Sequence, residues 1–191
     1  LTALSAVRSM IPFARAGYSV FASNYRGNDG GEGQDEFGGA EVHDILNLLA
    51  LAKTDPHWDG KNIFMLGHSR GGMMNALALR QGLLANAVVS VAGVSDVRAS
   101  QEERPLLAEQ VYKQIIPGYE ADMQGVLEAR SPVCWPEAIS APLLLLHGTA
   151  DEAVAMSHSV RLADALQTLG KPHKLVIYEG GNHALVRHWD A

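Results

Sequence analysis

Short apolar runs alternate with longer amphipathic segments along this chain, and this alternation restricts the fold more than any other feature of the sequence. Runs that are apolar throughout are typical of strands covered on both faces, and a helical segment supplies the connection that parallel strands need. The sequence therefore predicts an α/β fold, with a mostly parallel sheet and helices on both faces. Five strands are expected, at residues 18–22, 62–66, 87–92, 142–147 and 174–178.

The segments between these runs have helical periodicity. Residues 42–49 carry apolar side chains at three- and four-residue steps, which gives one apolar stripe. Residues 73–79 are rich in Ala and Leu, and the stripe over residues 160–169 is followed by Gly and then Pro, the order typical of a helix end. Residues 98–130 are more polar and contain helix-breaking prolines. There we expect an excursion of short helices that covers a site.

Size and charge exclude several classes of protein. The 191 residues suit one domain, and neither a repeat nor a linker divides them. A net charge of −6 has the wrong sign for binding nucleic acid through its phosphates. No apolar run reaches the roughly 18–20 residues that span a bilayer, so the sequence predicts a soluble protein with neither a nucleic-acid nor a membrane partner. Its oligomeric state is left open. The single cysteine, Cys134, excludes a disulfide within the chain and favours the cytoplasm only slightly over other compartments.

The segment Gly67-His68-Ser69-Arg70-Gly71-Gly72 carries the strongest chemical signal. It has the spacing Gly-x-Ser-x-Gly and stands between an apolar run and a helical segment. A serine on such a sharp turn has strained backbone angles and crowded neighbours, so both glycines are interpreted as a steric requirement. The turn lifts the Ser69 hydroxyl above the sheet, and the backbone N–H of Arg70 is the expected donor to an oxyanion. A dinucleotide fingerprint would need Gly in place of Ser69, and a P-loop would need Lys in place of Met73.

A serine hydroxyl becomes a nucleophile only beside a base, which a carboxylate in turn orients. Asp151 and His183 each follow an apolar run, so both are expected at the carboxyl edge of the sheet, where Ser69 also lies. The order Ser, Asp, His along the chain is characteristic of the α/β-hydrolase sheet. His188 remains an alternative base, and Glu152 and Asp96 remain alternative acids.

Other polar groups have simpler interpretations. The Arg70 side chain is expected to face solvent, and Arg26 either ties its loop to nearby polar groups or touches substrate. Residues 28–36 lack the ligand pattern of a calcium loop and are interpreted as a solvated loop. His183 and His188 lack the spacing of a helical zinc site. We therefore expect neither a metal nor an organic cofactor.

Several segments of the chain together match one known pattern: Asn24-Tyr25-Arg26-Gly27, the motif around Ser69, Arg130-Ser131-Pro132, His147-Gly148-Thr149-Ala150-Asp151 and Gly181-Asn182-His183. With these segments the chain resembles the catalytic domain of the prolyl oligopeptidase family of serine peptidases, essentially over its whole length. The resemblance implies Ser69 as nucleophile, His183 as general base and Asp151 as the residue that orients it. It also implies that Val154, three residues after the acid, lines the pocket for the residue preceding the cleaved bond.

The resemblance also implies what lies outside the sequence. Residues 1–191 are expected to form an α/β-hydrolase catalytic domain that is incomplete at its N-terminus, because the family's first strands, second oxyanion donor and propeller would lie upstream of Leu1. Ala153 stands where an arginine would bind a substrate carboxylate. The expected activity is that of a serine-type peptidase acting on peptides or acylated amino acids through an acyl-enzyme. A carboxylesterase and a non-catalytic hydrolase-like binding domain remain alternatives.

Overall fold

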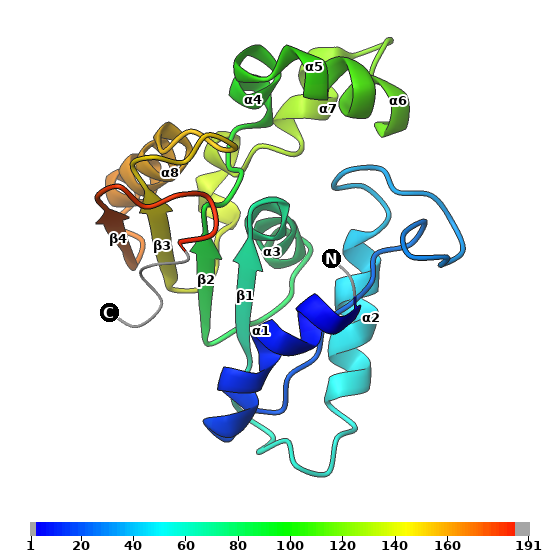
Figure 1. Ribbon diagram of the computed structural model, residues 1–191, viewed down its shortest axis with the longest axis vertical. Coiled ribbons are helices and arrows are strands. Elements are labelled where there is room, and N and C mark those ends of the chain that lie inside the picture. The colour runs from blue at the N-terminus through cyan, green and yellow to red at the C-terminus, as the bar shows by residue number, and fades with distance from the viewer. Residues whose placement is uncertain (1–2, 186–191) are drawn as a thin grey trace.

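Four parallel strands form the sheet in the part of the chain that the computed structural model describes, residues 3–185. They follow the order β1-β2-β3-β4, with Gly67 level with Ser90 and Leu145 level with Leu175 (Figure 1). All four carboxyl ends therefore meet at one edge of the sheet. The strands are β1 (Phe64–His68), β2 (Ala87–Val91), β3 (Leu143–Gly148) and β4 (His173–Tyr178).

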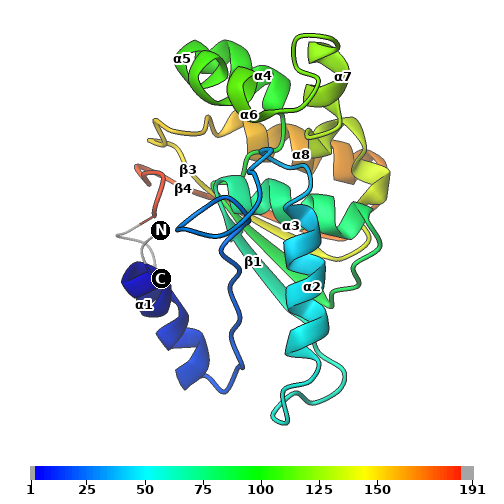
Figure 2. The same cartoon turned by 90° about the vertical axis from the view of Figure 1, so that its right-hand side faces the viewer.

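Helices α2 (Val42–Ala52), α3 (Arg70–Arg80) and α8 (Ser157–Thr168) lie on one face of the sheet, whereas α1 (Ala3–Arg15) lies on the other (Figure 2). This arrangement confirms the predicted α/β class with a parallel sheet. The amphipathic segments at 42–49, 73–79 and 160–169 are all helical, within α2, α3 and α8 apart from the last residue. None of the helices between residues 3 and 185 is both long and apolar enough to cross a bilayer.

The main core lies between the sheet and α3 and α8. Met73 and Met74 of α3 and Leu166 of α8 are fully buried against it. Burial alternates along the centre of the sheet, so that Val88 and Leu145 face the core. Residues at the carboxyl ends of β1 and β3 are thereby held on a rigid support.

The prediction of a strand at residues 18–22 is wrong. This segment is apolar enough for a strand, but its backbone does not pair with β1. Tyr18 packs only its ring against Phe64, edge-on with the centroids 5.9 Å apart. A strand requires a hydrogen-bonded neighbour as well as apolar side chains. Without this neighbour β1 is the edge strand of the described sheet, and Phe64 is 53% and Leu66 45% exposed.

Residues 97–128 form the predicted excursion of short helices, between β2 and β3 (Figure 2). It lies above the carboxyl edge of the sheet and is called the cap below. Its buried Tyr112 contacts Phe37 of the loop before α2, with ring centroids 4.8 Å apart. The cap elements are α4 (Val97–Glu103), α5 (Pro105–Leu107), a π-helical turn (Ala108–Tyr112), α6 (Lys113–Ile115) and α7 (Met123–Glu128).

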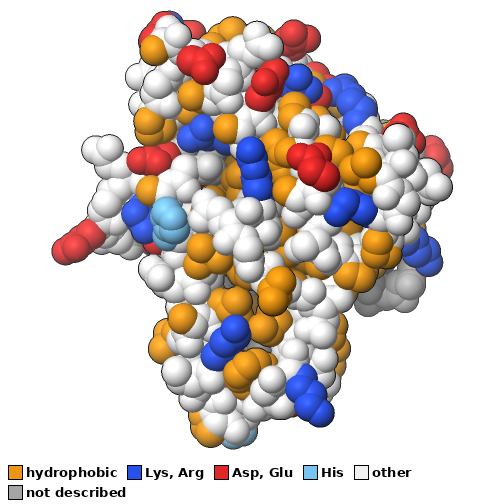
Figure 3. All heavy atoms as spheres, turned by 180° about the vertical axis from the view of Figure 1, so that it is seen from behind, with side chains coloured by type: hydrophobic (Ala, Val, Ile, Leu, Met, Phe, Trp, Pro, Cys, Tyr) orange, Lys and Arg blue, Asp and Glu red, His pale blue; other side chains and the backbone are white. Residues whose placement is uncertain are grey.

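Figure 3 shows Lys and Arg interspersed with Asp and Glu on the face opposite to that of Figure 1, without a large field of one sign.

Candidate active site

Ser69 forms a strained elbow between β1 and α3. Its backbone angles are φ 56° and ψ −121°, in the positive-φ region that residues with a side chain rarely adopt. The elbow is fixed because the Ser69 N–H donates to the Val91 carbonyl at 2.9 Å and the Ser69 carbonyl accepts from Val94 at 3.1 Å. Strain held this way at a strand end points to a functional position.

The glycines around the elbow differ in whether the structure has room for a side chain. A Cβ on Gly67 would lie 2.2 Å from the Gly71 carbonyl oxygen, and one on Gly72 would lie 2.4 Å from Ser90 Oγ. A Cβ on Gly71 would meet nothing within 4 Å outside its own helix. The expectation that Gly71 needs the absence of a side chain is therefore wrong. The tight contact is made by the backbone of Gly71, and the residue that must lack a Cβ is Gly67.

Asp151 and His183 are brought together by two loops at the carboxyl ends of β3 and β4. His183 Nδ1 lies 2.8 Å from Asp151 Oδ2, the Asp151 side chain is fully buried and that of His183 is 26% exposed. The loops touch where a Cβ on Gly148 would lie 2.0 Å from the Gly181 carbonyl oxygen. This oxygen accepts a hydrogen bond from the backbone N–H of Ala150 at 2.9 Å.

Asp151 is held as a carboxylate. Burial acts to raise its pKa, but hydrogen bonds from the backbone of Val154 and from His183 and Ala153 lower it, and the net pKa lies below its ordinary value. Its Oδ1 accepts from the N–H groups of Ala153 at 2.8 Å and Val154 at 2.9 Å. An ionised acid at this point can orient a histidine through Nδ1 and stabilise its protonated form.

His183 also reaches the serine elbow, through His68. The Nε2 atom of His68, the residue before Ser69, lies 2.8 Å from the His183 carbonyl oxygen, and the two imidazole rings lie 4.6 Å apart. Within residues 3–185 the Ser69 hydroxyl makes no hydrogen bond. The structure thus joins His183 to Asp151 and sets His183 beside the elbow, while no hydrogen bond joins Ser69 to His183. Such contacts often tighten only when substrate binds.

The sequence predicts that the Arg70 side chain faces solvent, and this prediction is wrong. Its guanidinium donates to Asp35 Oδ1 at 2.6 Å and to the fully buried Glu41, and it lies 4.7 Å from the ring centre of Phe37 and 5.3 Å from that of Tyr25. Burial acts to lower the pKa of Arg70, but the two carboxylates raise it above its ordinary value. As the first residue of α3, Arg70 also carries a backbone N–H that has no partner inside the helix.

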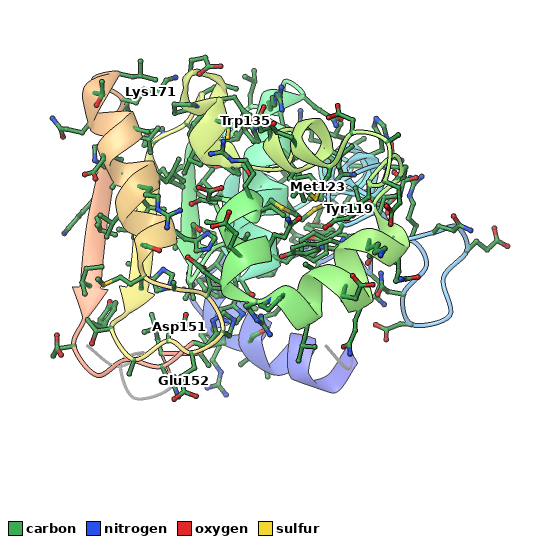
Figure 4. All side chains as sticks on the ribbon, turned by 90° about the horizontal axis from the view of Figure 1, so that it is seen from above. Tyr119, Met123, Trp135, Asp151, Glu152 and Lys171 are labelled. Atoms are coloured by element: carbon green, nitrogen blue, oxygen red, sulfur yellow. The ribbon has the colours of Figure 1, made fainter. Side chains whose placement is uncertain are left out.

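The alternative acids lie in other surroundings. Asp96 caps α4 by accepting from the Ala99 N–H at 3.2 Å, and it forms an ion pair with Arg161 at 3.0 Å. Glu152 is exposed at the outer side of its loop, beside Asp151 (Figure 4). Neither makes the contact with His183 that Asp151 makes. The alternative base, His188, lies outside the described residues.

Three further predictions from the sequence concern Arg26, the loop at 28–36 and Val154. Arg26 forms an ion pair with Asp44 at 2.6 Å and donates its backbone N–H to the same carboxylate, which is the tying role expected for it. The loop at 28–36 is exposed as far as Gln34, but Asp35 turns inward to Arg70. Val154 packs in the main core at 6% exposure, and its contact with substrate stays a prediction.

Sequence reasoning missed His68 and His147 as parts of the site. His147 is fully buried, and its Nε2 lies 3.2 Å from Asp151 Oδ2. A signal for it was present, because a histidine directly after four leucines of a buried strand needs polar partners. His68 occupies a position of the serine motif that tolerates any residue, so no signal pointed to it.

Nothing between residues 3 and 185 gathers three or more His, Cys, Asp or Glu side chains in a way that would hold a metal ion.

The sheet is parallel, a strained serine elbow follows β1, an aspartate follows β3 and a histidine follows β4. This arrangement defines an α/β hydrolase. The chain belongs to the prolyl oligopeptidase family, whose sequence model matches residues 5–190. It is 37% identical over 175 residues to a Bacillus subtilis (strain 168) protein named uncharacterized peptidase YtmA, covering 91% of this chain and 68% of that protein.

Solved structures of two peptidases are similar to this chain. The acylaminoacyl peptidase of Pyrococcus horikoshii matches with a TM-score of 0.68 and 26% identity, over 78% of this chain and 24% of that one. A puromycin-hydrolyzing peptidase of Mycobacterium tuberculosis matches with a TM-score of 0.69 and 28% identity, over 80% of this chain and 24% of that one. The chain thus spans about a quarter of each of these enzymes. Family and relatives together identify a serine peptidase or hydrolase.

Proposed function

We propose that residues 1–191 form a peptidase catalytic domain in which Ser69, His183 and Asp151 act as the catalytic triad. Ser69 Oγ attacks the substrate carbonyl carbon while His183 Nε2 takes the hydroxyl proton, and His183 then gives that proton to the leaving amine. Water, activated by the same histidine, hydrolyses the acyl-enzyme. The observation that carries the proposal is the 2.8 Å contact between His183 Nδ1 and the buried, ionised Asp151, beside the strained elbow of Ser69.

The negative oxygen that forms during attack requires donors. The backbone N–H of Arg70 lies at the start of α3, where the helix dipole also favours negative charge. We propose this N–H as one oxyanion donor. No side-chain proton is needed for it, so the Arg70 guanidinium stays free to hold the loop before α2.

The proposed substrates are peptides or acylated amino acids. The support is membership of a peptidase family and similarity to an acylaminoacyl peptidase and a puromycin-hydrolyzing peptidase. Val154, in the turn that also holds Asp151, is the proposed side chain against the residue preceding the cleaved bond. We propose that the cap, which lies above the carboxyl edge (Figure 2), restricts access to this site.

Substrate class is tested with the full-length protein on a panel of peptide p-nitroanilides, N-acetylamino-acid p-nitroanilides and p-nitrophenyl esters. We expect hydrolysis of amides as well as esters, and a loss of about 10⁶-fold in kcat in Ser69→Ala, which removes the nucleophile. Hydrolysis of the esters alone would contradict peptidase activity and favour a carboxylesterase. A folded protein that hydrolyses neither would favour a binding domain.

A further inference from the structure

His147 lies at the carboxyl end of β3 with its side chain fully buried. Its Nε2 is 2.9 Å from the carbonyl oxygen of Val154 and 3.2 Å from Asp151 Oδ2, and its Nδ1 is 2.7 Å from Ser159 Oγ. Three segments thus meet at one imidazole: the strand, the turn that carries the acid, and the first turn of α8.

These partners determine which nitrogen carries the proton. A carbonyl oxygen and an ionised carboxylate accept hydrogen bonds and cannot donate. Because both face Nε2, this nitrogen carries the proton, and it donates to Val154. In the neutral ring Nδ1 then accepts the hydroxyl proton of Ser159.

The ring reaches the acid by two routes. Directly, the Nε2–H dipole lies against Asp151 Oδ2, the oxygen closest to His183 Nδ1. Indirectly, His147 fixes Val154 through its carbonyl, and Val154 donates its own N–H to Asp151 Oδ1 at 2.9 Å. Both oxygens of the carboxylate are therefore held in relation to one buried ring.

We propose that His147, with its proton on Nε2, is a positioning residue that sets the Asp151 carboxylate against His183. The proposal rests on the proposed triad. An apolar side chain here would fill the space beside the leucines of β3, but it would leave the Val154 carbonyl without its donor. The turn that carries Asp151 would then lose the contact that fixes its far end.

Two amides of similar size separate the functions of the two ring nitrogens. In His147→Gln the side-chain amide reaches the place of Nε2 and can still donate to Val154. In His147→Asn the amide reaches only the place of Nδ1, so the bond to Ser159 is kept and the donor toward Val154 and Asp151 is lost. His158→Asn is the matched control, because His158 is also buried and bonded at both nitrogens, to the backbone of Asp96 and to Glu103 rather than to Val154 or Asp151.

The readouts are the second-order rate constant of labelling by a fluorophosphonate and the far-downfield proton signal of His183 Nδ1–H, assigned by its loss in His183→Ala. We expect His147→Asn to be labelled about 10- to 100-fold more slowly, since small displacements of a catalytic group cost about this much. Its downfield signal should be lost. His147→Gln and His158→Asn should keep both the rate and the signal.

A purely structural histidine would give another pattern. Equal rates in His147→Asn and His147→Gln, whether both slow or both normal, with the signal intact, would overturn the proposal. The tautomer is tested on the wild-type protein, independently of any variant: a ¹H–¹⁵N spectrum should show His147 protonated at Nε2, and a proton at Nδ1 instead would overturn the assignment. If the wild type is not labelled, or Ser69→Ala still is, the triad itself is wrong and His147 has no acid to position.

Discussion

At the scale of single residues, Arg70 joins the serine elbow to the loop before α2. Its guanidinium lies between two carboxylates and beside two aromatic rings, while its backbone starts α3. Glu41 also accepts from the backbone N–H groups of Gly38 and Gly39, so the charge cluster fixes the loop as well. One side chain thus couples the position of the proposed oxyanion donor to a loop far away in the sequence.

Asp35→Asn should make this coupling measurable. Burial acts to raise the pKa of Asp35, but the Arg70 guanidinium, Asn28 and the Phe37 N–H lower it well below its ordinary 3.8. The folded state therefore binds fewer protons than the unfolded state at low pH, and stability is lost as pH falls below about 4. We expect Asp35→Asn to cost about 1–3 kcal/mol at pH 7 and to flatten this pH dependence.

Urea unfolding at pH 7 and pH 3 provides the measurement, with Asp164→Asn, an exposed position on α8, as control. The control should match the wild type at both values. An unchanged difference between the two pH values in Asp35→Asn would contradict the role given to this carboxylate.

The sequence predicted the residues of the proposed triad but not the partners of Arg70, for a physical reason. Ser69, Asp151 and His183 each lie within a few residues of the end of an apolar run, so the strand ends place them. Asp35 and Glu41 lie in a loop without periodicity, where composition alone indicates solvation. Only the tertiary structure brings them to Arg70.

At the scale of elements, the site is made where strands end and pass into a helix or a loop. Four of the five expected strands and all three expected helices are present with small shifts at their ends, because apolar runs and stripes report burial directly. The segment at 18–22 is apolar like the four runs that form strands, but it has no neighbouring strand to pair with. Composition does not show whether such a neighbour exists. The sequence of the π-helical turn in the cap also lacks a periodic pattern that would predict a π-helix there.

The serine elbow gives a prediction at this scale, since its two glycines differ in their surroundings. Gly67→Ala places a Cβ against the backbone of Gly71, which cannot move without displacing the elbow, and we expect a loss of about 3 kcal/mol or more. Gly71→Ala meets open space and should leave stability nearly unchanged. Thermal unfolding of the two variants checks this, and equal losses would contradict the assignment of the tight contact to Gly67.

At the scale of the whole molecule, the parallel sheet accounts for the meeting of residues that are distant in sequence. Each of the four described strands points its carboxyl end to one edge, where the serine elbow and the loops that carry Asp151 and His183 lie under the cap (Figure 1). In a protein of the prolyl oligopeptidase family this edge is where acyl transfer is expected. The account depends on Ser69 being the residue that is acylated there.

Peptide mapping by mass spectrometry after fluorophosphonate treatment tests that claim most directly. We predict a single adduct, on the peptide that contains Ser69, with the same peptide unmodified in His183→Ala over the same time because the base is missing. An adduct on a different residue, or modification of Ser69 at the same rate without His183, would contradict the account.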